Sequence, residues 1–247
     1  MHKKEIKESS CFFMRKTFKK INDNLKHLFP YKGKGPSSEA FLSEIDSLIH
    51  LGANQGQERK KYWEYGLKVD WIEAIPTVYG TLQKNIRFFR NQKAFQGLIT
   101  NEDGKEYVFN IASNHGESSS IYDLKEHQAM WPHIHYVDKI KVKSQTLPEF
   151  LKRNKIRLSA KQGLLIDAQG AEYVIIQGAE KILKNFTWII AETATFEWYK
   201  GAHCLSDVVE IMKKNGFTEE SRKLTKSKEG IGECYDILFR NEQSRRD

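Results

Sequence analysis

The stretch "DSLIHLGANQGQERKKY", residues 46–62, decides the fold. Apolar residues lead into a turn of five residues, Gly52-Ala53-Asn54-Gln55-Gly56, and charged residues that favour helices follow it. This order predicts a strand, a tight glycine turn and a helix, which is the layout of a nucleotide-binding α/β unit. The residue just before the turn region, His50, stands where such loops often carry an acid.

The spacing of the glycines limits what the turn can hold. A dinucleotide fingerprint needs G-x-G-x-x-G, because its second glycine lets the backbone approach a pyrophosphate, and here that position is Asn54. A nucleoside ligand without a diphosphate, such as S-adenosylmethionine, suits this G-x-x-x-G turn better. Glu73 ends the next expected strand, 21 residues after Gly52. An acid at that place accepts hydrogen bonds from both ribose hydroxyls.

Strand-like and helix-like segments alternate along the rest of the chain. Strands are expected over 47–51, 68–73, 94–100, 163–167 and 188–192, and helices over 57–65, 77–87, 171–183 and 205–215. This alternation predicts a mostly parallel sheet with helices on both faces. The last two strand-like segments, 217–224 and 234–240, have no helix between them, so they predict an antiparallel hairpin at one edge.

One segment interrupts the alternation. Residues 101–150 contain a turn, a short strand at 107–111 and a polar stretch rich in serine and histidine. Because long loops in compact domains are usually functional, this segment is interpreted as a lid or substrate wall. Three of its residues are candidates for contact with a substrate: Asn114, His115 and Ser119. Glu192, at the end of a later strand, is a fourth.

The basic residues of the chain are concentrated near its start. The net charge is +8, and residues 1–34 alone, with ten Lys/Arg and three acids, account for +7. The remainder is nearly neutral, so a nucleic-acid partner is not expected for the catalytic part. The sequence divides into a basic amphipathic helix and linker at 1–36 and a globular domain at 37–247. The apolar seam at 3–29 favours packing within the domain or self-association, and contact with an anionic membrane surface is the alternative.

Composition restricts the location of the protein. No run of about 18 apolar residues exists, so no membrane-spanning helix is expected. The three cysteines are scattered and form no CxxC motif, which favours a reducing cytoplasm over secretion. The predicted location is therefore cytoplasmic, with the inner membrane surface as the alternative if the basic helix binds lipid.

With these residues in place, the chain resembles the FkbM family of S-adenosylmethionine-dependent methyltransferases. The resemblance covers roughly residues 46–240 and rests on ordered blocks: "IHLGANQGQE", "VDWIEAIP", "FNIASNHGESSS", "TLPEFL", "LLIDAQGAEYVIIQGAEKIL" and "IIAET". It implies a class I methyltransferase fold, a Rossmann-like sheet of seven mostly parallel strands with an antiparallel edge hairpin. It also implies O-methylation, often of a sugar hydroxyl or a natural product.

The resemblance also implies roles for individual residues. Four residues of the turn would flank the methionine part of the cofactor: Gly52, Ala53, Asn54 and Gly56. Glu73 would hold the ribose, the turn at Thr100 and Asn101 would contact adenine, and Asp167 would face the transferred methyl group. The chain departs from the family at His50, at Leu165 and at Pro148, where an acid, a lysine and an acid, respectively, are common.

Methyl transfer to a hydroxyl benefits from a base that takes its proton. Asp167 and His127 are the leading candidates for this base, and His115 is a third. His127, His133 and His135 could resemble a metal cluster, but no cysteine or acid with suitable spacing completes it, so no metal site is predicted. Asp167 and Glu192 end neighbouring expected strands, and a Mg²⁺ between them stays an alternative.

The leading hypothesis is an S-adenosylmethionine-dependent O-methyltransferase that acts on a hydroxyl of a glycan or a small glycosylated molecule. The alternatives are an RNA methyltransferase, motivated by the basic N-terminus, and a non-catalytic binding module, motivated by the three departures. His50 is expected to accept a hydrogen bond from the methionine ammonium when it is neutral. Cofactor affinity should then fall as the pH drops through the histidine range.

Overall fold

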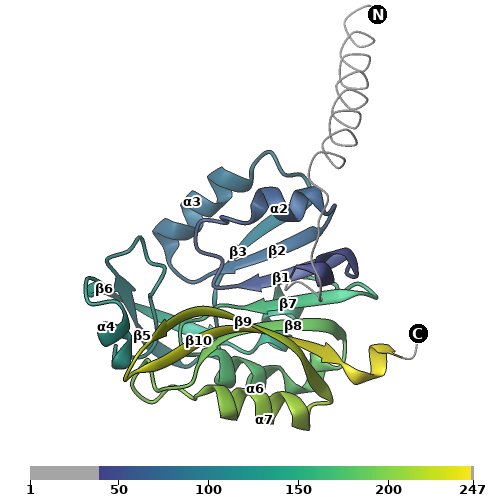
Figure 1. Ribbon diagram of the computed structural model, residues 1–247. Helices are drawn as coiled ribbons and strands as arrows, with labels where there is room; N and C mark the ends of the chain where they lie inside the picture. Colours follow the sequence, from purple (N-terminus) through teal and green to yellow (C-terminus); the bar gives the residue numbers. More distant parts are fainter. Residues whose placement is uncertain (1–38, 246–247) are drawn as a thin grey trace, which may run out of the picture. The chain divides into compact units, whose positions relative to one another are not determined.

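The computed structural model describes residues 39–245 (Figure 1). The expected helix at 3–29 and the domain boundary at 36/37 lie outside the described residues. The strands are β1 (Ser47–Leu51), β2 (Lys68–Glu73), β3 (Gln92–Gln96), β4 (Leu98–Ile99), β5 (Glu106–Ala112), β6 (Tyr136–Gln145), β7 (Gln162–Ile166), β8 (Phe186–Ala194), β9 (Phe217–Lys228) and β10 (Gly232–Asn241). The helices are η1 (Ala40–Ser43), α2 (Arg59–Glu64), α3 (Pro76–Ile86), α4 (Glu126–Met130), α5 (Leu147–Arg153), α6 (Glu172–Leu183), α7 (Leu205–Lys214) and η2 (Glu242–Arg245).

The main sheet has seven strands in the order β3-β2-β1-β7-β8-β10-β9. The first five run parallel, and β10 pairs antiparallel with both β8 and β9. The sequence prediction of a class I methyltransferase sheet, a Rossmann-like α/β arrangement with an antiparallel edge hairpin, is therefore confirmed. All five residues of β1 are buried, as expected for a central parallel strand that is covered on both faces.

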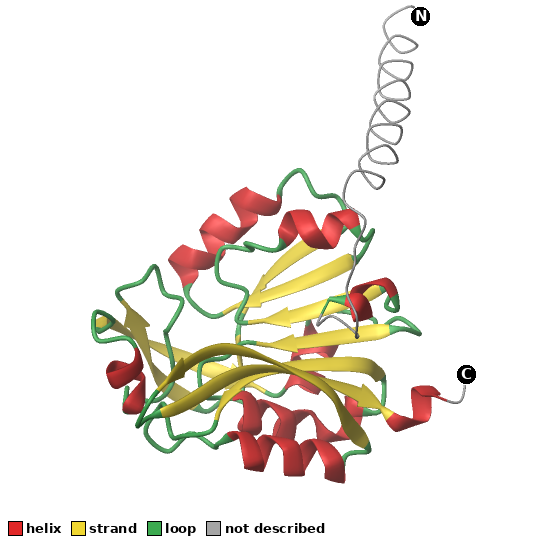
Figure 2. Cartoon of the chain, in the orientation of Figure 1, coloured by secondary structure: helices red, strands yellow, loops and turns green. Residues whose placement is uncertain are grey.

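Helices cover both faces of this sheet (Figure 2). On one face, η1, α2 and α3 pack with alternate strand residues such as Leu48 and Trp71. On the other face, α5, α6 and α7 pack with their neighbours Ile49 and Ile72. The alternation arises because successive side chains of a strand point to opposite faces, and it leaves the strand ends free to build a site.

The structure corrects one expectation for the middle of the chain. The strand expected over 94–100 is broken at Gly97, whose added Cβ would lie 2.4 Å from the Phe150 ring. β3 stays in the main sheet, whereas β4 pairs with β6 in a second sheet of order β4-β6-β5. Residues 101–150, interpreted as a lid or substrate wall, contain β5 and β6 of this small sheet together with α4 and α5. Neither β6 nor α5 was predicted from the sequence.

Two helical glycines give a matched test of how α6 packs. In Gly178→Ala the new Cβ would lie 2.4 Å from the Thr100 carbonyl oxygen, whereas in Gly80→Ala no atom lies within 4 Å. We expect Gly178→Ala to lower the free energy of unfolding by about 1–3 kcal/mol, the usual cost of overpacking. Gly80→Ala should raise it by up to about 1 kcal/mol through helix propensity. Urea unfolding measures both, and changes of the same sign would contradict the close packing of α6 on the Thr100 turn.

Candidate active site

The carboxyl ends of the parallel strands meet at one edge of the sheet, and two cavities open there. The first, the glycine-loop cavity, has about 580 Å³ of space including its mouth and is lined by residues such as Gly52, Glu73 and Leu98. The second, the lid cavity, has about 1030 Å³ including its mouth and is lined by residues such as His127 and Glu192. Asp167 lines both cavities.

Glu73 stands at the end of β2 and is buried, with 6% of its surface exposed. Its Oε2 accepts a hydrogen bond from the backbone N–H of Asn54 at 2.8 Å, and its Oε1 accepts one from Ile75 at 2.8 Å. Burial raises the pKa of Glu73 to about 7. Each oxygen retains a further lone pair, so the carboxylate can accept two more hydrogen bonds from a ligand in the glycine-loop cavity.

Apolar side chains form the rest of the glycine-loop cavity. They come from β4, β5, α6 and the adjoining loops: Ile75, Leu98, Ile99, Phe109, Ile121, Ala171 and Ile175. A flat heterocycle buried here would meet apolar surface on its faces, and the acid at Glu73 would bind its polar substituents. A cavity with an apolar slot and an acid at one end suits a nucleoside.

The glycine loop approaches the next strand closely. Gly52 has φ +73°, and an added Cβ would lie 1.7 Å from the Asp167 carbonyl oxygen. Gly56 has φ +69°, and its added Cβ would lie 2.7 Å from Leu82. Ala53 is buried, and its N–H donates to the Ile72 carbonyl at 3.1 Å. Only glycine allows this approach, so the loop positions Asn54 and Asp167 on the wall of both cavities.

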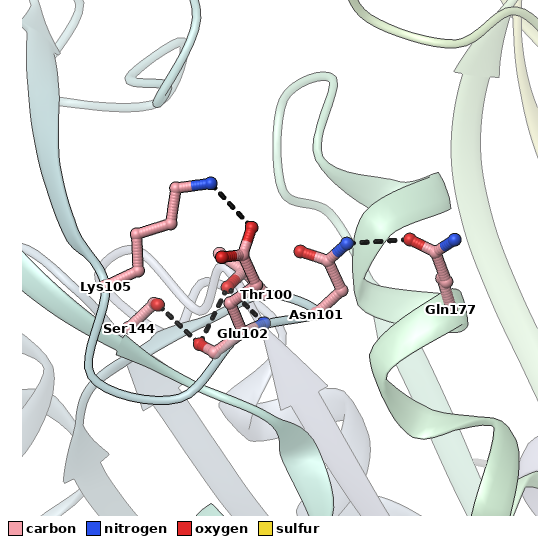
Figure 3. A network of polar contacts seen from close by, with 6 residues as sticks. All are labelled: Thr100, Asn101, Glu102, Lys105, Ser144 and Gln177. Carbon is pink, nitrogen blue, oxygen red and sulfur yellow. Dashed lines mark hydrogen bonds and ion pairs between the residues drawn. The ribbon is translucent and has the colours of Figure 1, made fainter.

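The structure places Thr100 and Asn101 away from the glycine-loop cavity. Figure 3 shows that Asn101 Nδ2 donates to Gln177 Oε1 of α6 at 2.7 Å, and that the N–H of Glu102 donates to Thr100 Oγ1 at 3.2 Å. Neither residue lines the cavity, whereas their neighbours Leu98 and Ile99 do. The adenine contact expected at Thr100 and Asn101 therefore does not follow from the lining of this cavity. We propose that Leu98 and Ile99 contact adenine instead.

The side chain of His50 packs between the main sheet and helix α2. It is 4% exposed, its ring stacks on Trp71 at 4.8 Å, and its Nδ1 lies 3.2 Å from the Tyr62 hydroxyl. Burial lowers the pKa of His50 to about 3, so the ring stays neutral throughout the physiological range. The expected fall in cofactor affinity through the histidine range therefore no longer follows from this residue, although His50 still borders the lid cavity.

Two carboxyl groups meet at the floor of the lid cavity. The amide nitrogen of Gln169 donates to Asp167 Oδ1 at 2.7 Å and to Glu192 Oε2 at 2.9 Å. The Tyr199 hydroxyl in turn donates to Gln169 Oε1 at 2.7 Å. Burial raises the pKa of Asp167 to about 6, and burial together with the Asp167 charge raises the pKa of Glu192 well above its usual range. Near neutrality, Asp167 is therefore the ionised member of the pair.

Gln169 was missed at the sequence level. It has a left-handed backbone, with φ +50°, which is uncommon for a residue other than glycine. Its carbonyl accepts a hydrogen bond from Ser120 Oγ at 2.7 Å, so it also binds the polar stretch after β5. The "IDAQG" block carried a signal, since a polar residue before a glycine at a strand end is typical of a functional turn.

The residues expected to bind substrate are distributed over both cavities. Asn114 lies on the lid cavity and bonds Ser118, whereas Ser119 lines the glycine-loop cavity and accepts from the N–H of Ala112. His115 is exposed, and its carbonyl accepts from Asn54 Nδ2 at 3.2 Å. Glu192 lines the lid cavity, and its contact with a substrate stays a prediction.

His127 is 1% exposed, and its Nε2 lies 3.2 Å from Ser118 Oγ. Burial lowers its pKa to about 4, so the imidazole is neutral near pH 7. His133 and His135 lie in the loop before β6 and outside any strand. Within residues 39–245, no group of three or more His, Cys, Asp and Glu side chains could hold a metal ion.

Solved structures similar to this chain include three methyltransferases. They include precorrin-6y C5,15-methyltransferase from Geobacter metallireducens (14% identity, 81% of this chain and 84% of that chain, TM-score 0.43). They also include fibrillarin from Aeropyrum pernix with bound S-adenosyl-L-methionine (10%, 80% and 67%, 0.45) and the N-methyltransferase NodS from Bradyrhizobium japonicum (11%, 80% and 86%, 0.44). At these identities and TM-scores, no property of those proteins is carried over to this chain.

No curated protein matches the chain in sequence. No described helix is long and apolar enough to cross a membrane. Residues 50–219 match the family described as the methyltransferase FkbM domain. Because this match spans more than half of the sequence, the chain belongs to the FkbM methyltransferase family and is an S-adenosylmethionine-dependent methyltransferase.

Proposed function

We propose that the protein is an O-methyltransferase whose acceptor is a hydroxyl of an uncharged glycan or small glycosylated molecule. The observation that carries this proposal is the lining of the lid cavity. It contains four acids (Glu58, Glu117, Asp167 and Glu192), and no lysine or arginine is among its described lining residues. An acceptor that bears phosphates would meet only negative charge there, whereas a neutral polyol would find many hydrogen-bond acceptors.

Aromatic side chains complete the same cavity. Trp131 and Trp198 line it, and the ring of His127 lies 4.6 Å from the Trp131 ring. Flat apolar surface beside carboxylates and amides suits a sugar, which has apolar C–H faces and polar edges. Trp198 Nε1 and His127 Nδ1 are buried without a hydrogen-bond partner in the described part of the chain.

The glycine-loop cavity fits S-adenosylmethionine, since it offers an acid for the ribose, an apolar slot for adenine and a close backbone turn at Gly52. When bound, this cofactor supplies an electrophilic methyl group. Asp167 separates the two cavities and would take the proton of the acceptor hydroxyl. Protonated Glu192 donates to Asp167, and Gln169 positions both carboxyl groups.

A methyl-transfer screen tests the choice of acceptor. Tritium-labelled S-adenosylmethionine is incubated with the full chain and with neutral oligosaccharides, nucleotide sugars or RNA in separate reactions. We expect label in the neutral sugar fraction. Label only in RNA or only in the phosphorylated sugars would overturn the proposal and favour the alternative of an RNA or nucleotide-sugar methyltransferase.

A further inference from the structure

The end of the fold opposite the two cavities carries a strongly basic surface. β2 begins at Lys68 on this side and ends at Glu73 beside the glycine-loop cavity, which separates the two ends by about 17 Å. Two adjoining shallow cavities here share Arg90, Lys93 and Phe95. Between them they are lined by six basic residues: Lys68, Arg87, Arg90, Lys93, Lys155 and Arg157.

Negative charge does not balance this surface. Asp70 is the one acid among the described residues that line the two cavities. None of the six basic side chains forms a salt bridge within the described residues. The distribution is the reverse of that in the lid cavity, so the nearly neutral body of the protein has an acidic catalytic end and a basic opposite end.

Exposed aromatic side chains border the basic residues. Phe88 is 77% exposed and lies under the Arg87 guanidinium, whose Cζ is 4.5 Å from the ring centroid. Trp63 and Tyr65, at the end of α2, are 47% and 43% exposed. The Trp63 ring meets the Phe89 ring at 6.3 Å, so the end of α2 and the loop after α3 lie side by side, as Figure 1 also shows.

We propose that this surface, formed by the six basic residues with Trp63, Tyr65 and Phe88, docks the enzyme on an anionic lipid bilayer. Lysine and arginine bind the negative surface of such a bilayer, and aromatic side chains partition into its headgroup region. Basic and aromatic side chains lie side by side on this surface, as peripheral membrane binding requires.

One observation favours a bilayer over a nucleic acid. The surface lies at the far end of β2 from Asp167, so a nucleic acid bound to it would have to extend around the end of the sheet to present an acceptor to the lid cavity. Docking in this way leaves both cavities directed away from the lipid.

Vesicle flotation of the full chain tests the proposal. We expect the protein to bind vesicles of phosphatidylcholine with phosphatidylglycerol, to bind pure phosphatidylcholine vesicles weakly, and to dissociate as salt is raised. The triple variant Arg87→Glu, Arg90→Glu and Lys93→Glu should lower the partition coefficient about a hundredfold, since each basic residue near such a surface contributes about fivefold. Phe88→Ser, at a side chain that is 77% exposed, should lower it several-fold.

The matched control reverses three exposed lysines of β6 with the same change in net charge: Lys139→Glu, Lys141→Glu and Lys143→Glu. We expect it to retain most of the binding, and thermal melting should show that all variants remain folded. Equal losses in the two triple variants, or no vesicle binding by the parent chain, would overturn the proposal. Binding of a short RNA that the first triple variant abolishes, without vesicle binding, would also overturn it and assign the surface to nucleic acid.

Discussion

Asp167→Asn is expected to lower the rate of methyl transfer about 10²–10⁴-fold, the usual contribution of a positioned general base. The carboxylate lines both cavities, and its pKa of about 6 leaves it mostly ionised above neutrality. Asparagine has the same shape but cannot take a proton from a hydroxyl. The measurement is kcat with the acceptor from the labelled-methyl screen, together with calorimetric binding of S-adenosylhomocysteine, which should change little.

Asp236→Asn is the matched control for Asp167→Asn. Asp236 is partly buried, and its charge raises the pKa of Asp167. Removing that charge should lower the pKa of Asp167, so the acidic limb of the kcat profile should move to lower pH, with an unchanged plateau. His127→Gln addresses the competing assignment, because His127 also lines the lid cavity. A loss in His127→Gln that exceeds the loss in Asp167→Asn would transfer the role of base to the histidine.

Glu73→Ala is expected to weaken the binding of S-adenosylhomocysteine about a hundredfold or more. Hydrogen bonds to a charged group contribute about 1.5–3 kcal/mol each, and two ribose hydroxyls are available to the carboxylate. The same substitution removes the acceptor for the backbone N–H groups of Asn54 and Ile75, so the glycine loop should also lose order. Titration calorimetry measures the affinity, and Glu106→Ala, at an exposed position on β5, is the control.

The pH dependence separates Glu73 from His50. Burial raises the pKa of Glu73 to about 7, so the carboxyl is protonated below that pH and accepts hydrogen bonds poorly. Affinity for S-adenosylhomocysteine should therefore fall as the pH drops below about 7 and level off above it. Glu73→Gln should abolish this dependence, whereas His50→Gln should keep it, because the His50 pKa of about 3 lies outside the range. Loss of the dependence in His50→Gln would contradict this assignment.

The parts of the fold that local pattern determines could be predicted. The bounds expected for β1 and β2 match the observed ones, since each is an apolar run that ends at a turn. The second sheet was missed although "KIKVK" at 139–143 alternates with the period of a strand. The charged residues of β6 face outward, and β6 pairs antiparallel with β5. This strand therefore departs from the alternation of strands and helices on which the predicted fold was based.

The parts of the site that depend on backbone conformation could be predicted from the sequence. The parts that depend on side-chain packing were harder to predict. The glycine turn and the strand-terminal Glu73 follow from spacing, and both lie on the glycine-loop cavity. His50 is neutral because its ring is buried against Trp71 and Tyr62. The register between β1 and β2 places Trp71 beside the ring, and helix α2 supplies Tyr62. Gln169 acquires its position from a left-handed turn and from Tyr199, thirty residues away, so no local pattern could identify its partners.

The central claim is that the glycine-loop cavity binds S-adenosylmethionine for methyl transfer. Titration calorimetry of the full chain with S-adenosylhomocysteine, the product of that transfer, tests it most directly. The structure predicts saturable binding at one site per chain, which Glu73→Ala weakens and Glu106→Ala does not. An absence of binding at millimolar ligand, or equal binding by Glu73→Ala and the parent chain, would contradict it.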